Sequence, residues 1–515
     1  MTKQTHKVTR LSSILNQEHN LGPDSISLCY GHFNAIHPGH LRYFQTARKH
    51  GEKLFVALEG DEQLSEFERT QQFSQEERAQ AVAALDLVDL VIILDSGGLD
   101  VLIGSIRPST LVFGREFERE RSKEISGAVD IIKKLGGKVV YDVGETHYAT
   151  ADLFHGSPHE LEQKRWYQFK LALKNQRIEL DEVFNRFLES SKPRILVVGD
   201  TIVDRYVACD PIGLSSEAPV VVVKELETRD FIGGASIVAG HIASLGGNCV
   251  YVSVVGRDDK ADFVKDKLSD LGVVVNLLKD VSRPTTFKIR YLIENQKLFR
   301  VSKLKEHRLS AALENQVIAV LEKEAPSSNA IVISDFVYGV VTPKIVETAT
   351  RLSQEYHLPL IGDLQCSSQF GDVSKFKDFD LLCPTEREAR LALNNQDDGI
   401  EYVSNLLMEK TRASNLVIKL GTEGLITYCR SDRPGVIDRQ HFPAISVNPV
   451  DVSGAGDSLL AGMVLSLTRG LSIMEAAALA SCIAAIAVQI VGNCPVGIND
   501  LEQFILARSR ITNGI

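Results

Sequence analysis

Two short motifs of this 515-residue chain have the residue types and spacing for phosphate chemistry, and they differ in kind. The first, His37-Pro-Gly-His40, follows a short apolar run near the N-terminus. Pro38 and Gly39 suit a turn into a helix, on which the two histidines would face the same side. Their N–H groups could bind phosphate oxygens and stabilise charge on the α-phosphate of a nucleotide. Two histidines that merely start a helix are the alternative interpretation.

The second motif, Asp451-Val-Ser-Gly-Ala-Gly-Asp457, precedes an apolar segment at residues 458–467 that is expected to be a helix. Backbone N–H groups of its glycine-rich part can point to one place at the amino end of that helix. There they would stabilise a γ-phosphate during transfer, and Asp457 could take the proton from an attacking hydroxyl group. A glycine-rich turn capped by an aspartate is the alternative. A P-loop kinase is not expected, because no Gly-x-x-x-x-Gly-Lys-[Ser/Thr] sequence occurs.

Composition and charge limit the classes of protein that fit these motifs. The formal net charge of -10 argues against general nucleic-acid binding, which normally requires a basic face. The eight cysteines form no Cys-x-x-Cys pair, which is typical of reduced thiols rather than of disulfides or a zinc site. The polar N-terminus does not resemble a signal peptide, and the longest apolar stretch, residues 476–491, suits a buried helix. We therefore expect a cytoplasmic protein that binds neither nucleic acid nor membranes.

The first motif lies in a region of alternating strand and helix patterns, from about residue 25 to residue 144. The expected strands are Ser27–Tyr30, Leu54–Leu58, Leu90–Leu94, Thr110–Phe113 and Lys138–Tyr141, and the expected helices include Leu41–His50 and Gln75–Leu85. Strands that alternate with helices predict a parallel sheet covered on both faces. We assign this α/β domain to residues 1–150.

The second motif lies in a further α/β region that begins near residue 193. Residues 151–192, between the two regions, contain no strand-like run and are expected to form linking helices. The strands expected in the second domain, residues 193–515, are Ile195–Val198, Val220–Val223, Cys249–Val255, Thr286–Ile293, Ala330–Ser334, Leu360–Asp363, Leu381–Cys383 and Leu416–Leu420. Two domains agree with the chain length, which is too great for one ordinary core.

The first motif and its surroundings resemble the cytidylyltransferase-like nucleotidyltransferases, on the sequence Tyr30-Gly-His-Phe-Asn-Ala-Ile-His-Pro-Gly-His-Leu-Arg-Tyr-Phe-Gln-Thr-Ala-Arg48. The resemblance implies a Rossmann-like domain that joins a nucleoside triphosphate to a phosphorylated substrate and releases pyrophosphate, with His37 and His40 as catalytic residues. It implies nucleotide or phosphate binding by Gly31, Phe33, Gly39, Arg48, Gly114 and Thr150. Arg48 stands where the family often has a lysine. Leu58-Glu-Gly-Asp61 and Tyr148-Ala-Thr-Ala-Asp152 depart from the family pattern.

The second motif resembles the signature of the PfkB, or ribokinase-like, carbohydrate kinases, and the likeness extends through most of residues 194–500. It implies a ribokinase-like α/β domain with a small β lid, Asp457 as catalytic base, ATP as substrate, Mg²⁺ as cofactor, and a homodimer formed through this domain. The implied nucleotide- or phosphate-binding residues are Lys419, Gly421, Gly424, Gly454, Ala455 and Gly456. The implied substrate-binding residues are Asp204, Gly233, Gly234, Lys288 and Arg290, and Glu388 is the implied metal-associated carboxylate.

Within this family the chain most resembles the bifunctional heptose-phosphate kinase/ADP-heptose synthases, although its domain order is reversed. Ser216-Glu-Ala-Pro219, Arg283–Arg290 and Asn295–Arg300 carry this likeness. It implies phosphorylation at the anomeric position and an ADP-sugar product for surface polysaccharide. Ile237, Tyr338 and Gln365 differ from the heptose enzymes at the sugar site, so heptose 7-phosphate, a related sugar and an unphosphorylated sugar remain open.

Three functions are compatible with the sequence. The first is a bifunctional sugar kinase and nucleotidyltransferase that makes an ADP-heptose-like sugar. In the second, the kinase is accompanied by an N-terminal domain that activates another phosphorylated alcohol, for example with CTP. In the third, the N-terminal domain is catalytically silent and serves as a ligand-binding or oligomerisation module.

Overall fold

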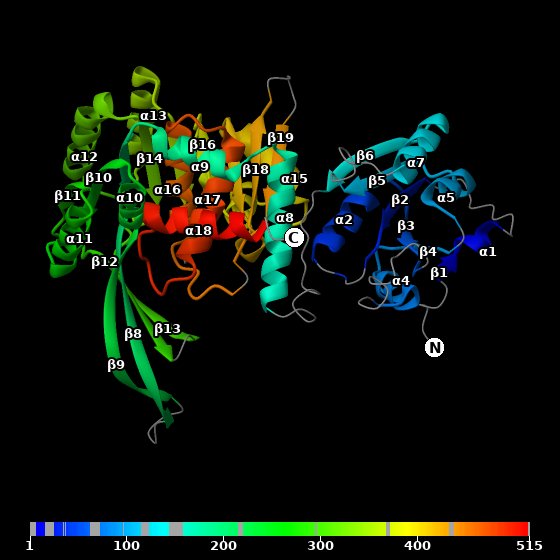
Figure 1. Cartoon of the computed structure of the whole chain (residues 1–515), viewed down its shortest axis with the longest axis horizontal. Coiled ribbons are helices and arrows are strands. Elements are labelled where there is room, and N and C mark those ends of the chain that lie inside the picture. The colour runs from blue at the N-terminus through cyan, green and yellow to red at the C-terminus, as the bar shows by residue number, and fades with distance from the viewer. Residues whose placement is uncertain are drawn as a thin grey trace. The chain divides into compact units, whose positions relative to one another are not determined.

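The computed structural model describes residues 7–15, 25–33, 36, 38–61, 73–95, 97–114, 123–143, 158–214, 220–293, 296–366, 371–431, 437–446 and 448–512. The chain divides into two units (Figure 1). The first comprises residues 1–157 together with 394–406, and the second comprises residues 158–393 and 407–515. Two of the predicted site residues, His37 and Thr150, lie outside the described residues.

The first unit is built on a six-stranded sheet with the strand order β1-β4-β3-β2-β5-β6, in which every pairing is parallel. The strands are β1 (Val8–Arg10), β2 (Ile26–Gly31), β3 (Lys53–Glu59), β4 (Leu90–Leu94), β5 (Thr110–Gly114) and β6 (Lys138–Val143). The helices are α1 (Leu11–Leu15), α2 (Pro38–Arg48), α4 (Gln75–Ala83), α5 (Leu99–Ile106) and α7 (Lys123–Lys134).

Helices cover both faces of this sheet because successive strand residues point to opposite sides. Leu28 of β2 belongs to an apolar cluster with residues of α5 and α7, whereas its neighbour Cys29 belongs to a second cluster with residues of α2 and α4. The predicted parallel sheet with two covered faces is thereby confirmed. Strand β1, which pairs with β4 at the edge of the sheet, was not predicted from the polar N-terminal sequence.

The second unit contains a nine-stranded sheet with the order β11-β10-β7-β14-β15-β16-β17-β18-β19. Pairing is parallel from β11 to β17 and antiparallel for β18 and β19. The strands are β7 (Arg194–Gly199), β10 (Asn248–Val255), β11 (Val274–Lys279), β14 (Ala330–Asp335), β15 (Leu360–Leu364), β16 (Leu381–Leu382), β17 (Asn415–Lys419), β18 (Leu425–Arg430) and β19 (Ile437–Phe442). The helices are α10 (Ala235–Ser244), α11 (Asp259–Asp270), α12 (Ala311–Glu324), α13 (Pro343–Tyr356), α14 (Glu386–Leu393), α16 (Ala455–Thr468), α17 (Ile473–Ala487) and α18 (Ile498–Thr512). A further helix, α15 (Ile400–Thr411), begins in the first unit and ends in the second, because residues 394–406 belong to the first.

A separate four-stranded sheet, which we call the lid sheet, projects from this unit (Figure 1). Its strands are β8 (Thr201–Leu214), β9 (Val221–Gly234), β12 (Thr286–Ile293) and β13 (Gln296–Lys303), in the order β13-β12-β8-β9. Strand β8 begins directly after β7, so the lid sheet continues from the main sheet through Asp200. The predicted small β lid is therefore present, and it brings β8 and β12 side by side in parallel.

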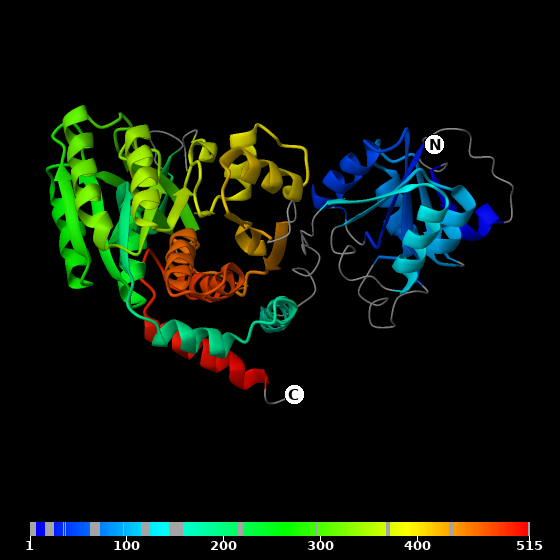
Figure 2. The same cartoon turned by 90° about the horizontal axis from the view of Figure 1, so that it is seen from above.

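The segment predicted to link the domains forms two helices, α8 (Pro158–Asn175) and α9 (Leu180–Glu189). Both run close to α18 in the second unit (Figure 2). Phe169 and Phe187 are fully buried and belong to the same apolar cluster as Val197 of β7 and Leu479 of α17. The two helices are thus part of the core of the second unit.

Helix α17 accounts for most of the longest apolar stretch of the sequence. Its side chains are buried almost throughout, which confirms the predicted buried helix. Among the described residues, no helix is both long enough and apolar enough to cross a membrane.

Candidate functional site

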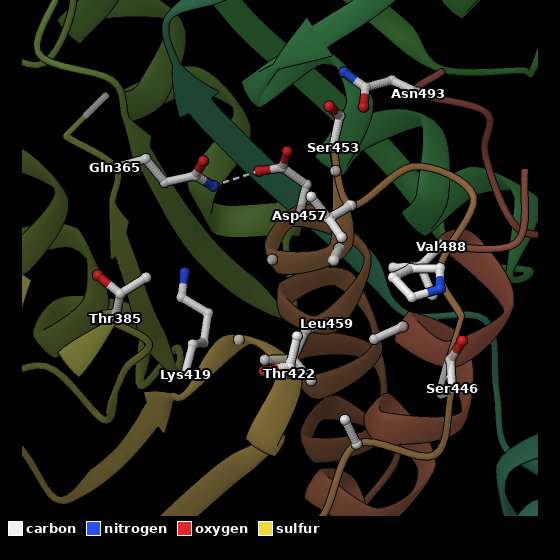
Figure 3. A pocket seen from close by; sticks show the side chains of 18 of the residues that line it. Gln365, Thr385, Lys419, Thr422, Ser446, Ser453, Asp457, Leu459, Val488 and Asn493 are labelled. Atoms are coloured by element: carbon white, nitrogen blue, oxygen red, sulfur yellow. Dashed lines mark hydrogen bonds between the residues drawn. The ribbon is translucent and has the colours of Figure 1, made fainter. Parts of the chain in front are cut away.

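A cavity of about 600 Å³ lies in the second unit, a size that suits a small-molecule ligand. Its lining includes residues of lid strands β8, β12 and β13, the carboxyl end of β17 and the amino end of α16. Figure 3 shows Lys419 and Asp457 from the last two of these places. Ligands of open α/β sheets usually bind outside the carboxyl ends of the parallel strands. The cavity therefore lies where this fold places its ligand sites.

The amino end of α16 is shaped by two glycines of the second motif. Gly454 has a left-handed φ of +79°, and a Cβ atom at this position would lie 2.6 Å from Oδ1 of Asn493. A Cβ atom on Gly456 would lie 3.3 Å from Nζ of Lys419. Glycine at these positions therefore allows the backbone and the ammonium group to approach one another closely.

Two backbone N–H groups at this helix end are available to a ligand. Among the described residues, the N–H groups of Gly456 and Asp457 donate to no other group. The N–H group of Ala455, which was expected to bind phosphate together with those of Gly454 and Gly456, donates over 3.4 Å to the carbonyl oxygen of Val452. Free N–H groups and the helix dipole together favour an anion at this end of α16.

Asp457 lies in the first turn of α16 and is 4% exposed. Burial, together with the nearby charge of Asp363, raises the pKa of the Asp457 carboxyl group to about 7. Nε2 of Gln365 donates to Oδ1 of Asp457 over 2.6 Å (Figure 3). A carboxyl group with a pKa close to neutral is well matched to the role of a general base.

Lys419, the last residue of β17, keeps its charge inside the protein. Its Nζ atom donates to Oδ1 of Asp363 over 2.7 Å, and Gln365 donates to the other oxygen of that carboxylate over 3.0 Å. Burial works against the ammonium form, but the charges of Asp363 and Glu388 hold the pKa of Lys419 above its ordinary value. A charged ammonium group thus lies beside the amino end of α16.

Glu388 lines the cavity from the first turn of α14 and is 6% exposed. Its carboxylate oxygens accept the backbone N–H groups of Cys366 over 2.9 Å and Thr385 over 2.8 Å. No group of three potential metal ligands occurs among the described residues. Mg²⁺ usually binds through one or two carboxylates, several waters and substrate phosphates, so an acidic residue at this place fits an ion that arrives with a nucleotide.

The lid sheet lines one part of the cavity, and this part contains Asp204, which is 4% exposed. Arg290 of β12 donates to one oxygen of its carboxylate, and Nδ2 of Asn493 donates to the other over 3.0 Å. A Cβ atom on Gly233 would lie 2.5 Å from the Asp204 carboxylate, so only glycine fits there. Gly234, with a φ of +63°, lines the cavity next to it.

Three cationic side chains of the lid sheet face this part of the cavity. Arg290 lies directly opposite Arg300 of β13, and both line the cavity together with Lys288. Lys288 is 4% exposed, and its ammonium nitrogen lies 5.2 Å from the ring centroid of Tyr338. Within the described part of the chain, neither Lys288 nor Arg300 has a carboxylate partner. The lid thus brings more positive than negative charge to this place.

The structure brings the predicted site residues of the second domain together around this cavity. All of them line it except Gly233, which lies against Asp204. Of the positions that differ from the heptose enzymes, Ile237 is buried in the core and does not line the cavity, whereas Gln365 does. Asn493 was not predicted as a site residue, because no motif marks it and its contact with Asp204 spans 289 residues of sequence.

The predicted site of the first domain is described only in part. His40 lies in the first turn of α2, where its ring makes an edge contact with Phe33 at a centroid distance of 5.0 Å. Phe33 has an unusual φ of +52°, and Gly31 precedes it at the end of β2. Gly39 is in the same turn as His40, and Gly114 is the last residue of β5.

Arg48 lies at the other end of α2, roughly 12 Å along the helix axis from His40. It forms an ion pair with Asp89, the residue before β4, at the amino end of that strand. The structure therefore does not bring Arg48 to His40.

A buried arginine that was not predicted from the sequence binds groups at the carboxyl ends of β2 and β3. Arg78 of α4 is 1% exposed and donates to the carbonyl oxygens of His32 and Glu59 and to the carboxylate of Asp61. Hydrogen bonds from His32 and Tyr30 hold the pKa of Glu59 below its ordinary value, although burial opposes this. The unusual Glu-Gly-Asp sequence is thus part of a closed polar network. The sequence feature that points to this network is a charged residue, Arg78, on the buried side of α4.

Family models match both parts of the chain. The model of the pfkB family carbohydrate kinases matches residues 192–496, and the cytidylyltransferase-like model matches residues 28–143. The chain therefore belongs to the PfkB family of carbohydrate kinases, and a cytidylyltransferase-like segment precedes its kinase region.

Individual relatives are bifunctional proteins. The bifunctional protein HldE of Campylobacter jejuni subsp. doylei is 31% identical over 321 residues, which are 62% of this chain and 66% of that protein. HldE of Pelobacter propionicus is 30% identical over 324 residues, 62% of this chain and 64% of that protein. The alignments thus span less than two thirds of these relatives. The crystal structure of phosphofructokinase-2 from Escherichia coli in complex with potassium has a TM-score of 0.51 at 18% identity, with 62% of this chain and all of that chain covered. It shows the fold alone.

Proposed function

We propose that the second unit transfers the γ-phosphate of ATP to a sugar hydroxyl group. The observation that carries this proposal is the buried carboxyl group of Asp457, with a pKa of about 7, at the amino end of α16. The acceptor hydroxyl gives its proton to Asp457 while its oxygen attacks the γ-phosphorus. The bond from that phosphorus to the β–γ bridging oxygen breaks, and ADP leaves.

The charge of the transferring phosphoryl group requires positive partners during this step. The N–H groups of Gly456 and Asp457 and the ammonium group of Lys419 would supply them. Mg²⁺ would be held through Glu388 and would neutralise charge on the nucleotide phosphates when bound. Gly421 and Gly424 also line the cavity, which supports their proposed place beside the nucleotide.

The lid sheet supports a phosphorylated acceptor. Like charges directly opposite on neighbouring strands repel each other, so Arg290 and Arg300 favour an anionic group between them. Lys288 adds a third cation in the same part of the cavity. Asp204, which accepts a hydrogen bond from Arg290, offsets one of these three positive charges. Heptose 7-phosphate is the acceptor that we propose, on this charge and on the likeness to the heptose enzymes.

For the first unit we propose nucleotidyl transfer to a sugar phosphate, with an ADP-sugar for surface polysaccharide as the product. The match to the cytidylyltransferase-like model and the position of His40 at the start of α2 support this. His37 would act with His40 on the α-phosphate. The departures at Glu59 and Asp61 keep a CTP-dependent or silent domain as the alternatives.

The kinase proposal is tested by replacing the base. We expect Asp457→Asn to lower turnover of ATP and heptose 7-phosphate by about 10²- to 10⁴-fold, because general base catalysis is lost, while ATP binding measured by calorimetry is retained. Asp266→Asn, on the exposed side of α11, is the matched control. Unchanged turnover in Asp457→Asn would contradict the assignment. If other sugars in a substrate panel are phosphorylated and heptose 7-phosphate is not, the kinase assignment stands and the proposed acceptor is wrong.

The nucleotidyl proposal is tested by pyrophosphate release from each nucleoside triphosphate with a panel of sugar phosphates. We expect release with ATP, and loss of release in His40→Ala with kinase turnover intact. Release with CTP alone would favour the second function, and no release with any nucleotide would favour the silent domain.

We also propose a cytoplasmic homodimer. None of the eight cysteines forms a disulfide, which supports a reducing compartment. Exposed apolar residues of the lid sheet support association of two copies there, with exposed fractions of 66% for Ile212, 60% for Val221 and 58% for Leu226. Light scattering tests the dimer, because Leu226→Glu should shift the mass of a lid-mediated dimer toward that of the monomer.

A further inference from the structure

Asp451, the first residue of the 451–457 turn, is the point at which the lid sheet meets the site. Its side chain is 5% exposed and accepts four hydrogen bonds. Two come from the backbone N–H groups of Ser453, over 3.0 Å, and Gly492, over 3.1 Å. Two come from the lid sheet, from the hydroxyl group of Tyr206 over 2.6 Å and from Nζ of Lys297 over 2.9 Å.

Lys297 contacts more than one residue of this turn. Its ammonium group also donates to Oγ of Ser453 over 3.1 Å, and the hydroxyl oxygens of Tyr206 and Ser453 lie within hydrogen-bond distance of each other, at 3.1 Å. Burial works against the charged form of Asp451, but hydrogen bonds from Tyr206 and Lys297 lower its pKa to about 2. The Asp451 carboxyl group is therefore charged at neutral pH. The Lys297 side chain of β13 lies between the Asp451 and Ser453 side chains, just before Gly454.

We propose that Lys297 is a positioning residue that holds the 451–457 turn from the lid sheet. The bond from the Ser453 N–H group to Asp451 closes the turn immediately before Gly454, whose left-handed φ directs the chain into α16. A shift of Asp451 would move the N–H groups of Gly456 and Asp457, and displacements of about 1 Å at a reacting centre can cost on the order of 100-fold in rate. This inference rests on the phosphotransfer proposed above.

A purely structural role for the same ion pair makes a different prediction. Lys297 is 42% exposed at its side chain, so the pair could simply join lid and body, as many half-exposed ion pairs do. Loss of such a pair would lower the unfolding temperature and leave the affinity for the γ-phosphate unchanged. The two roles are separated by measurements on ligands that differ only in that phosphate.

The experiment compares Lys297→Ala with the wild-type full-length chain in binding of AMP-PNP and of ADP, each with Mg²⁺, by calorimetry. We expect affinity for AMP-PNP to fall at least fivefold and affinity for ADP to change less than twofold. Turnover of ATP with heptose 7-phosphate should fall at least tenfold. Lys303→Ala, an exposed lysine on the same strand, is the matched control and should behave as wild type.

Chemical rescue completes the test. The place of the deleted ammonium group would still be bounded by Oδ1 of Asp451 and Oγ of Ser453, and its exposure admits small cations. Ammonium or methylammonium chloride should restore AMP-PNP affinity in Lys297→Ala, and tetramethylammonium chloride at equal ionic strength should not. Wild-type AMP-PNP affinity in Lys297→Ala, or a loss that ammonium does not restore and that ADP shares, would overturn the proposal. Absent sugar turnover in the wild-type chain would count against the kinase function instead, because the binding measurements need no acceptor.

Discussion

Asp457 sets the expected pH dependence of the kinase at the residue scale. Its pKa is raised to about 7 by burial and by Asp363, and only the deprotonated carboxylate can accept the hydroxyl proton. We therefore expect kcat/KM, which reports the free enzyme, to rise about tenfold from pH 6 to pH 8. Initial rates across this range at low acceptor concentration give the measurement. A flat profile would exclude Asp457 as the titrating base.

Gln365 offers a second prediction at this scale. Its amide group donates to both Asp363 and Asp457, and a donated hydrogen bond stabilises the charged carboxylate. Gln365→Leu removes that donor, so the pKa of Asp457 should increase and the acidic limb of kcat/KM should move to higher pH. Gln354→Leu, at an exposed position of α13, should leave the limb in place. A limb that moves to lower pH would contradict this account of the hydrogen bond.

The sequence identified the residues of contiguous motifs better than those brought in from a distance. Asp457 was assigned because its motif fixes it at a helix start, and Lys419 because its surrounding sequence resembles that of the carbohydrate kinases. Asn493 and Arg78 were not, because their partners are set by tertiary packing that no local spacing records. Arg48 was assigned by analogy alone, and its ion pair with Asp89 lies at the other end of α2.

The amino end of α16 gives a prediction at the scale of elements. Gly454 and Gly470 have nearly the same φ, +79° and +80°, but only Gly454 would bring a Cβ atom against another residue, Asn493. Backbone strain from a left-handed alanine costs about 1–2 kcal/mol at either position. Beyond this shared loss of stability, we expect kinase turnover to fall at least tenfold in Gly454→Ala and to stay at the wild-type level in Gly470→Ala. Denaturant unfolding and kinase rates of the two variants provide the comparison, and equal turnover would contradict it.

Strands buried on both faces were the elements that the sequence predicted well. Strand β14 is buried at every position, and a continuous apolar run of that kind stands out in the sequence. Most of β9 in the lid sheet was missed, because its exposed and partly buried residues follow no regular alternation. Strand β1 was missed because it is short and mostly polar.

The helices α8 and α9 lead to a prediction about the whole molecule. Phe169 and Phe187 are fully buried in the core of the second unit, and loss of one such side chain costs about 3–5 kcal/mol. A fragment of residues 158–515 should therefore fold and retain kinase activity. A fragment of residues 190–515 should unfold at a clearly lower temperature or aggregate. Thermal unfolding of both fragments tests this, and equal stability would show that the two helices are dispensable.

The separate cores of the two units bear on how such a gene can arise. The apolar clusters of the first sheet draw on residues 8–140, and the cluster around α16 and α17 draws on residues 166–505, so these clusters share no residue. Each coding segment thus carries the apolar side chains that its own unit has to bury. Fusion of two ancestral reading frames would preserve both cores in either order.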